Sequence, residues 1–155
     1  MERIASFSVN HTKLFAGLYL SRVDTKDGQS VSTFDIRFTA PNREPVLDMP
    51  ALHTIEHIGA TYLRNCPKKS DIVYFGPMGC RTGFYLVMFG DLKSEDVFDL
   101  VVDMCEFIIS FEGDIPGAKP EECGNYSEQN LPMAKYYTAK YLKQLTENRR
   151  LKYPD

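Results

Sequence analysis

The stretch from His53 to His57 restricts this chain more than any other. Two histidines lie four residues apart, with Glu56 directly before the second. At 3.6 residues per turn, the histidines, the glutamate and Ala60 fall along one stripe of a helix. The adjoining face holds the residues that can pack inward, namely Leu52, Ile55, Gly59 and Leu63. The stretch therefore predicts a helix with one face in the core and an imidazole face able to hold a metal ion.

The H-x-x-E-H pattern leaves alternatives open. It is also the inverted zinc-peptidase motif, in which the glutamate is the base for a metal-bound water. That reading needs a downstream glutamate as third ligand, and the candidates are Glu121, Glu122 and Glu128. A non-enzymatic binding module with a structural zinc would need four protein ligands. Histidines that only form hydrogen bonds, without a metal, are the remaining reading.

The composition fits one globular domain over residues 1–155, with 43% hydrophobic and 25% charged residues. A net charge of −3 and a pI near 5.6 argue against nucleic acid or an anionic membrane surface as the main partner. The first residues contain no apolar run of signal-peptide length, and we expect no membrane span. We therefore expect a cytoplasmic protein whose four cysteines are reduced thiols.

Two strands joined by a tight turn are predicted before the helix. Asp27-Gly28 is a two-residue turn signal between strand-like runs at 14–23 and 32–39. A shorter alternation at 6–11 predicts an extended segment. In the second run we expect Phe34, Ile36 and Phe38 to point inward, and Thr33, Asp35 and Arg37 to point outward.

The central helix is predicted to run from about Met49 to Asn65, with Asp48 as N-cap and Pro50 in its first turn. Strands are predicted at 71–75 and 84–89. The second of these is too apolar for an exposed strand, and we expect it to be central in the sheet. The glycine-rich loop between them carries Cys80.

Two further helices are predicted in the second half of the chain. One is capped by Ser94 and has a buried stripe of Val97, Val101, Met104, Cys105 and Ile108. The other starts near Pro132, after an irregular loop at 112–120, and packs through Met133, Tyr137, Tyr141 and Leu145. The pattern as a whole favours an α+β fold, a single domain with an antiparallel β-sheet covered by α-helices.

Two imidazoles do not complete a tetrahedral site, so a third ligand must come from elsewhere. Cys105 belongs to an apolar stripe, and Cys66 lies about 20 Å along the helix from His53. Cys80 and Cys123 remain, both in loops with glycine neighbours. We interpret one as a metal ligand and the other as an acid/base, although the spacing does not say which is which. Such a site keeps an open fourth position and suits zinc or ferrous iron.

The chain resembles S-ribosylhomocysteine lyase, the LuxS family, from near its first residue to about Leu145. The H-x-x-E-H piece alone is weakly specific, but five pieces in this order in a short chain are highly specific. The matching pieces are Ser6-Phe7 with His11 to Leu14, Arg37-Phe38, His53 to His57, Gly76 to Tyr85, and Glu122 to Tyr126.

This resemblance implies a metal centre and an acid/base pair. The metal would be ferrous iron (Fe²⁺), with zinc or cobalt as substitutes, held by His53, His57 and Cys123. Cys80 and Glu56 would be the catalytic pair, with Cys80 moving protons between sugar carbons. Glu56 would move protons between oxygens and finally to the departing sulfur.

The resemblance also implies a substrate and an assembly. Similar proteins cleave the thioether of S-ribosylhomocysteine by carbonyl migration and β-elimination, giving homocysteine and dihydroxypentanedione, the precursor of autoinducer-2. Ser6, His11 and Arg37 would lie near this small-molecule substrate, in a homodimer with active sites at the subunit interface. Tyr74 stands where many similar proteins carry an acid, and Gln129 where a histidine is common, so these two positions bear on substrate contacts.

Overall fold

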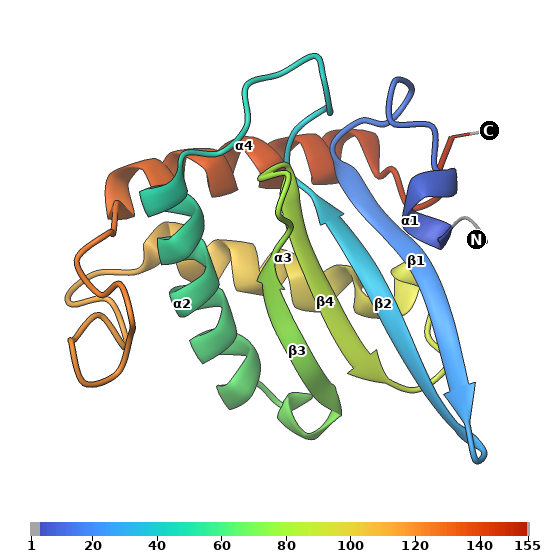
Figure 1. The fold of residues 1–155 in the computed structure, drawn as a ribbon, viewed down its shortest axis with the longest axis horizontal. Coiled ribbons are helices and arrows are strands. Elements are labelled where there is room, and N and C mark those ends of the chain that lie inside the picture. The colour runs from blue at the N-terminus through green and yellow to red at the C-terminus, as the bar shows by residue number, and fades with distance from the viewer. Residues whose placement is uncertain (1–3, 155) are drawn as a thin grey trace.

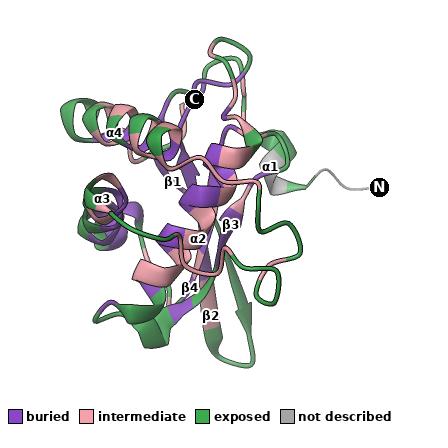
Figure 2. Ribbon diagram, turned by 90° about the vertical axis from the view of Figure 1, so that its left-hand side faces the viewer, coloured by how far each residue is buried: buried purple, intermediate pink, exposed green. Residues whose placement is uncertain are grey.

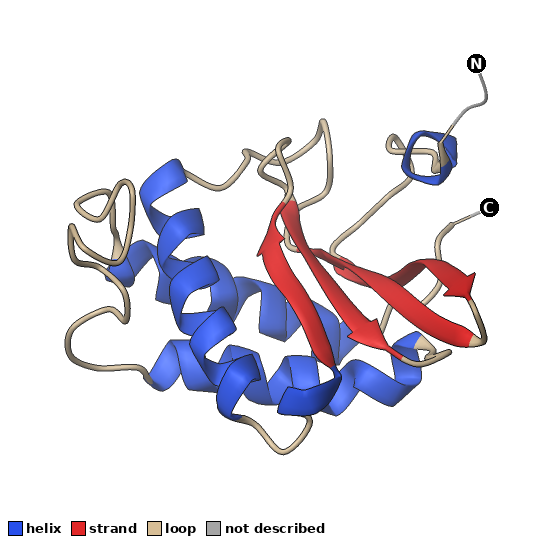
Figure 3. Cartoon of the chain, turned by 60° about the horizontal axis from the view of Figure 1, so that its bottom comes forward, coloured by secondary structure: helices blue, strands red, loops and turns tan. Residues whose placement is uncertain are grey.

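The computed structural model describes residues 4–154, without the side chains of residues 5 and 6. Four antiparallel strands form one sheet in the order β1-β2-β4-β3. Three long helices lie on one side of this sheet, which confirms the predicted α+β class (Figures 1 and 3). The elements are α1 (Ala5–Ser8), β1 (Gly17–Lys26), β2 (Gln29–Arg37), α2 (Met49–Asn65), the 3-10 turn η1 (Lys69–Asp71), β3 (Ile72–Pro77), β4 (Gly83–Phe89), α3 (Ser94–Ser110) and α4 (Leu131–Asn148).

The hairpin of β1 and β2 follows from its turn. Asp27 and Gly28 both have positive φ, at 52° and 78°, as a type I′ turn requires. The resulting register places one set of β2 side chains on the helix-covered face, and all three predicted inward residues are buried there: Phe34, Ile36 and Phe38. Asp35 and Arg37 lie on the other face of the sheet, as expected from the alternation.

Although they point outward, these two charged residues are buried. Asp35 is 1% exposed and Arg37 3% exposed. They form an ion pair of 2.5 Å, and Tyr153 from the C-terminal end covers the pair with a hydrogen bond to Asp35. The alternation of β2 reports which face a residue occupies, but it carries no information about a segment that returns from the far end of the chain.

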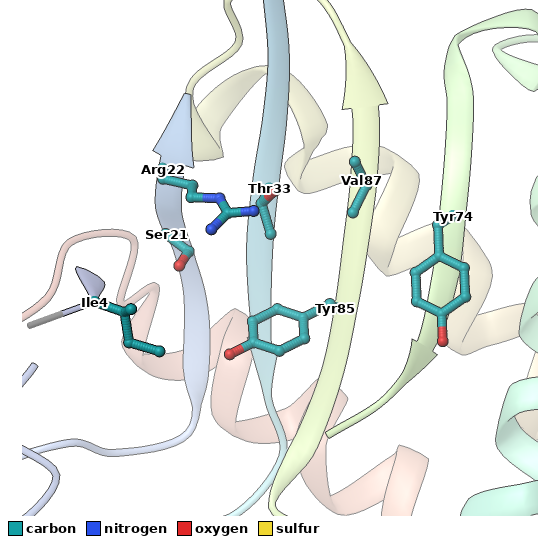
Figure 4. A pocket seen from close by; sticks show the side chains of 7 residues that line it. All are labelled: Ile4, Ser21, Arg22, Thr33, Tyr74, Tyr85 and Val87. Carbon is teal, nitrogen blue, oxygen red and sulfur yellow. The ribbon is translucent and has the colours of Figure 1, made fainter. Parts of the chain in front are cut away.

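Strand β4 is central, as predicted, because it pairs with β2 on one side and β3 on the other. Phe84, Leu86 and Met88 point from it into the core. Its alternate residues, Tyr85 and Val87, point to the opposite face, where no helix other than the short α1 lies among the described residues. This face, here called the uncovered sheet face because no long helix lies on it, is hollowed by a cavity lined by Ile4, Ser21, Arg22, Thr33, Tyr74, Tyr85 and Val87 (Figure 4).

Helix α2 has the predicted bounds. The Asp48 carboxylate accepts from the Ala51 N–H at 3.3 Å, and Pro50 lies in the first turn. All four predicted inward residues are buried, and Gly59 lets the helix approach β3 because a Cβ there would lie 2.7 Å from the Phe75 ring. The imidazole stripe remains half-buried, and Figure 2 shows both buried and intermediate residues along α2.

Helices α3 and α4 close the core. The predicted buried stripe is confirmed for α3 and only partly confirmed for α4. All five predicted α3 residues are fully buried. On α4, Tyr141 and Leu145 are buried, but Met133 and Tyr137 are only half-buried. A strict spacing of four drifts about 40° per step around a helix. The buried line therefore follows the 4-3-4 spacing of Ala134, Thr138, Tyr141 and Leu145.

Two local expectations were also wrong. Lys93, not Ser94, is the N-cap of α3, and its N–H donates to the Asp96 carboxylate at 2.8 Å. The Ser94 side chain is buried as the first residue of the helix. At the N-terminus, α1 replaces the start of the extended segment expected at 6–11. Phe7 is 64% exposed, so no buried face stabilises a strand there.

Candidate active site

Two imidazoles and one sulfur converge where the α3–α4 loop packs against α2. His53 and His57, one turn apart on α2, place their Nε2 atoms 2.9 Å from each other. The Cys123 Sγ lies 3.4 Å from the His53 Nε2. All three ligand atoms are within 4.8 Å of one another, and this is the one such group among the described residues. The spacing permits all three to bind one ion.

Backbone carbonyls fix the orientation of both rings. The Pro116 carbonyl oxygen lies 2.6 Å from the His57 Nδ1, and the Glu128 carbonyl oxygen lies 3.0 Å from the His53 Nδ1. A carbonyl oxygen only accepts, so each Nδ1 carries the proton. Each Nε2 then turns a lone pair toward the other across 2.9 Å, which is repulsive unless a cation lies between them. Such backbone partners are typical of metal-bound histidines.

The α3–α4 loop supplies Cys123, the third member of this group, and both carbonyls. Its backbone approaches His57 closely at Gly117, where φ is 72° and a Cβ would lie 3.0 Å from the His57 Nδ1. A glycine suits both the left-handed backbone and this approach. The Cys123 N–H donates to the Lys119 carbonyl at 3.0 Å, which closes the turn that presents the sulfur.

Gln129 contacts this centre from the outside. Its amide nitrogen is placed 3.3 Å from the His53 Nδ1, and its amide oxygen accepts from the Thr54 hydroxyl at 2.7 Å. Thr54 also accepts from the Asn130 N–H at 2.9 Å. Because the His53 Nδ1 donates to the Glu128 carbonyl, the Gln129 amide nitrogen makes no hydrogen bond to it, and Gln129 is anchored beside His53 through the Thr54 hydroxyl. Tyr74, the other unusual position, is 51% exposed and lines the cavity of the uncovered sheet face.

A cavity opens over the three ligands. Glu56 lines it on the same stripe of α2 as the histidines, as the helical spacing predicted. The other lining residues come from α2, β3 and the α3–α4 loop, namely Ala60, Thr61, Phe75, Pro116, Gly117, Glu122 and Gly124. A carboxylate beside an open metal position can accept or deliver a proton there.

Cys80 belongs to a second group of polar side chains at the β3–β4 turn. The Arg37 Nη1 lies 3.9 Å from the Cys80 Sγ and donates to the Thr82 hydroxyl at 2.5 Å. Its Nη2 donates to the Asp35 carboxylate. The Cys80 and Thr82 side chains are 3.1 Å apart. Cys80 is exposed, whereas the arginine beside it is buried, so a thiol at the surface lies next to a fixed cation.

The turn brings this group together through close backbone packing. Arg81 takes a left-handed conformation with φ 58°, and its N–H donates to the Met78 carbonyl at 2.9 Å. Gly83 pairs with Arg37, and a Cβ on it would lie 2.2 Å from the Ile36 carbonyl oxygen. Glycine at 83 therefore allows the tight pairing that sets Cys80 beside Arg37.

Burial governs the charges in this second group. It raises the pKa of Asp35, while Arg37, the Tyr153 hydroxyl and His11 act in the opposite direction. Burial acts to lower the pKa of Arg37, but the Asp35 carboxylate outweighs it and raises that pKa. The arginine therefore stays charged at the position where it faces Cys80.

A family model described as S-Ribosylhomocysteinase (LuxS) matches residues 4–152. The chain belongs to the LuxS family. It is 55% identical over 142 residues to the S-ribosylhomocysteine lyase of Finegoldia magna, covering 92% of this chain and 90% of that protein. Identity to the lyase of Phocaeicola vulgatus is 56% over 149 residues, covering 96% and 92%. The lyase of Borreliella burgdorferi is 54% identical over 157 residues, covering 99% and 100%.

LuxS membership and the group of two histidines and one cysteine together argue against the two alternatives, an inverted zinc peptidase and a structural-zinc module. An inverted zinc peptidase would need a downstream glutamate as third ligand, but the group that converges on the histidines contains Cys123. A closed structural zinc would need a fourth protein ligand, and the group among the described residues has three. Cys105 is fully buried, with a pKa that burial raises, and Cys66 is buried at the far end of α2.

The predicted substrate residues of this LuxS chain are only partly placed. His11 is half-buried, with its Nδ1 2.9 Å from the Val9 carbonyl, and it lies close enough to affect the charge of Asp35. Arg37 lies beside Cys80. The Ser6 side chain falls outside the described residues. Cys80 is not among the residues that line the cavity over the three ligands, so the described part of one chain shows two groups of polar residues.

Several supporting residues were missed from sequence. The carbonyls of Pro116 and Glu128 leave no sequence signal, because every residue carries one. Asp35 and Thr82 did leave a signal in the sequence. Asp35 shares a strand face with Arg37, with which it pairs, and Thr82 lies two residues after Cys80, which its side chain contacts. Alternation on one strand would have found the Asp35–Arg37 pair had the two charges been considered together.

Proposed function

We propose that this chain is a metal-dependent S-ribosylhomocysteine lyase that releases homocysteine and dihydroxypentanedione, the precursor of autoinducer-2. The observation that carries the proposal is the convergence of His53, His57 and Cys123, with both Nδ1 atoms bound by carbonyls. Membership of the LuxS family and the names of its relatives support the reaction type.

Ferrous iron is the metal we propose, with zinc or cobalt as substitutes. Imidazole nitrogen suits iron and zinc, and a thiolate adds a soft ligand that excludes magnesium and calcium. The three protein ligands leave room for substrate oxygen in a further position. When bound, the ion supplies Lewis-acid polarisation of the sugar oxygens.

The residues around the ligands would move the protons. The carbon–sulfur bond breaks by β-elimination once the sugar carbonyl is adjacent to the carbon that loses a proton, with the sulfur on the next carbon. Cys80 as a thiolate would take a proton from the carbon next to the carbonyl and return it to the neighbouring carbon. Glu56 would carry protons between oxygens and deliver one to the departing sulfur, so homocysteine leaves as a thiol. The buried cation of Arg37 supports the negative sulfur of Cys80.

Arg37, His11 and Ser6 are proposed to contact the substrate. Arg37 and His11 are grouped around Asp35, on the same face of the sheet as Tyr85. Substrate specificity would then come from polar groups outside the metal ligands, because hydroxyl-rich sugars are selected through hydrogen bonds that a wrong substrate leaves unpaired.

A homodimer with active sites at the interface is proposed from the uncovered sheet face. Tyr74 of β3 and Phe89 of β4 are exposed there, and Tyr85 and Val87 of β4 are half-buried beside them. Exposed apolar side chains gathered on one face mark an interaction surface.

Sedimentation equilibrium should give twice the chain mass of 17.7 kDa. Arginine in place of Val87 should shift the mass toward the monomer, whereas a monomeric wild type would refute the proposal.

A cytoplasmic location is proposed from the cysteines. The chain has four free thiols, two of them buried and two near the polar groups described above. Reduced thiols beside a catalytic site suit a reducing compartment. Among the described residues, no helix has the length and apolarity that crossing a bilayer demands.

Removing the metal should abolish the reaction reversibly. After chelation under anaerobic conditions, homocysteine release from S-ribosylhomocysteine should fall by at least about 100-fold, because a metal-polarised carbonyl is worth several kcal/mol. Ferrous iron should restore the rate, and zinc and cobalt should restore it in part. Magnesium is the control and should restore nothing. Full turnover by metal-free protein, or recovery with magnesium, would contradict the proposal.

A further inference from the structure

The last residues of the chain form a defined segment against β1. Helix α4 ends at Asn148, and Arg149 takes a left-handed conformation with φ 42° that turns the chain back. The Arg150 carbonyl accepts from the Leu18 N–H at 3.0 Å, and its guanidinium lies 4.8 Å from the centre of the Phe15 ring. Residues 149–154, here called the C-terminal segment, are therefore held by backbone and side-chain contacts. The segment follows α4 at the C-terminal, red end of the ribbon (Figure 1).

Tyr153 reaches the buried ion pair from this segment. Its ring stacks on Tyr19, with ring centres 4.8 Å apart and planes 16° from parallel. Its hydroxyl donates to the Asp35 Oδ2 at 2.9 Å. Burial and the nearby Asp35 carboxylate both raise the pKa of Tyr153, so the hydroxyl keeps its proton and remains a donor. A hydrogen bond from a neutral donor to a buried carboxylate is among the strong ones.

This hydrogen bond bears directly on Arg37. The Asp35 Oδ2 accepts from both Arg37 and Tyr153, whereas its Oδ1 has no hydrogen-bond partner among the described residues. The carboxylate is therefore oriented by two donors on one oxygen. The opposite arm of the guanidinium faces Thr82 and Cys80. A planar guanidinium transmits a displacement at one arm to the other, so the Tyr153 hydroxyl helps to set the cation beside the sulfur.

We propose that Tyr153 is a positioning residue for the reaction, acting through Asp35 and Arg37 on Cys80. The effect on turnover rests on the proposed role of Cys80 as an acid/base. The C-terminal segment then has a functional task besides closing the fold. Loss of the hydroxyl leaves the stacked ring in place and removes one of the two donors that orient Asp35.

The test compares Tyr153→Phe with Tyr136→Phe in the metal-loaded enzyme. Tyr136 is 60% exposed, so its variant is a matched loss of a hydroxyl. Tyr153→Phe should lower kcat by about tenfold, because the buried Asp35 carboxylate loses one of the two donors that orient it and, through it, the Arg37 guanidinium. Iodoacetamide should also alkylate Cys80 several-fold more slowly, as read from its peptide by mass spectrometry. Tyr136→Phe should change neither quantity.

A double-mutant cycle with Asp35→Asn shows whether the effect passes through Asp35. If it does, Tyr153→Phe should add little once Asp35→Asn is already present. Equal kcat and alkylation rate in Tyr153→Phe and wild type would overturn the proposal, as would a full Tyr153→Phe effect on top of Asp35→Asn. A lower thermal midpoint with an unchanged alkylation rate of the folded protein would also overturn it. Slower alkylation combined with full turnover by Cys80→Ala would instead refute only the role of Cys80.

Discussion

Cys123→Ala should lose the metal and, with it, homocysteine release. The substitution removes one of the three ligand atoms that lie within 4.8 Å of one another. Loss of a partner outside the ligand shell already costs about 10- to 100-fold in metal affinity, so loss of the ligand itself should cost more. Two imidazoles would remain, oriented by their carbonyls but unable to hold the ion alone against a chelator.

The measurement is bound metal per chain after gel filtration, together with thiol release from S-ribosylhomocysteine. Cys66→Ala is the matched control, because that thiol is buried at the end of α2 and donates to the Leu63 carbonyl at 3.3 Å. It should keep one metal ion per chain and nearly full turnover. A Cys123→Ala protein that retains metal at wild-type affinity would show that the ligand set proposed here is incorrect.

Cys80→Ala should give the complementary result, keeping the metal and losing turnover. Cys80 is grouped with Arg37 and Thr82, not with the three ligand atoms, so its loss leaves the ion in place. A positioned acid/base contributes about 10²- to 10⁴-fold to a rate, and kcat should fall by that amount. Serine at this position should rescue little, because a hydroxyl ionises far less readily than a thiol.

Gly79→Ala is the control for the turn that carries Cys80. A Cβ at Gly79 meets nothing within 4 Å, and the residue has no positive φ that would disfavour a side chain. This variant should therefore fold and turn over as the wild type does. If Cys80→Ala released homocysteine at the wild-type rate, the assignment of the acid/base to this thiol would fail, whatever the metal content.

The sequence left the roles of these two thiols open, and the resemblance assigned them. The structure places Cys123 against His53 and Cys80 against Arg37, which supports that assignment. Distance along the chain could not have made the choice. Cys123 is 70 residues from His53, and the α3–α4 loop brings it there through turns and carbonyl contacts.

The same contrast holds for the charged residues of β2. Alternation correctly placed Asp35 and Arg37 on the face away from the helices, but it did not predict that the pair is buried there. Their burial depends on Tyr153, which is 118 residues from Asp35 in the chain. The extended prediction for 6–11 failed for a related reason, since a strand is stabilised by pairing with a neighbour, and the described sheet consists of β1 to β4 without residues 5–8.

The sequence alone determined the helix at 49–65, its imidazole stripe, the hairpin at Asp27-Gly28 and the central place of residues 84–89. Each of these depends on local periodicity, capping or turn chemistry, which neighbouring residues specify. Tertiary structure alone decided which thiol meets the histidines, which carbonyls orient them, and which segment buries the Asp35–Arg37 pair. Those outcomes depend on contacts between segments 70 to 118 residues apart, and no local pattern encodes where such segments meet.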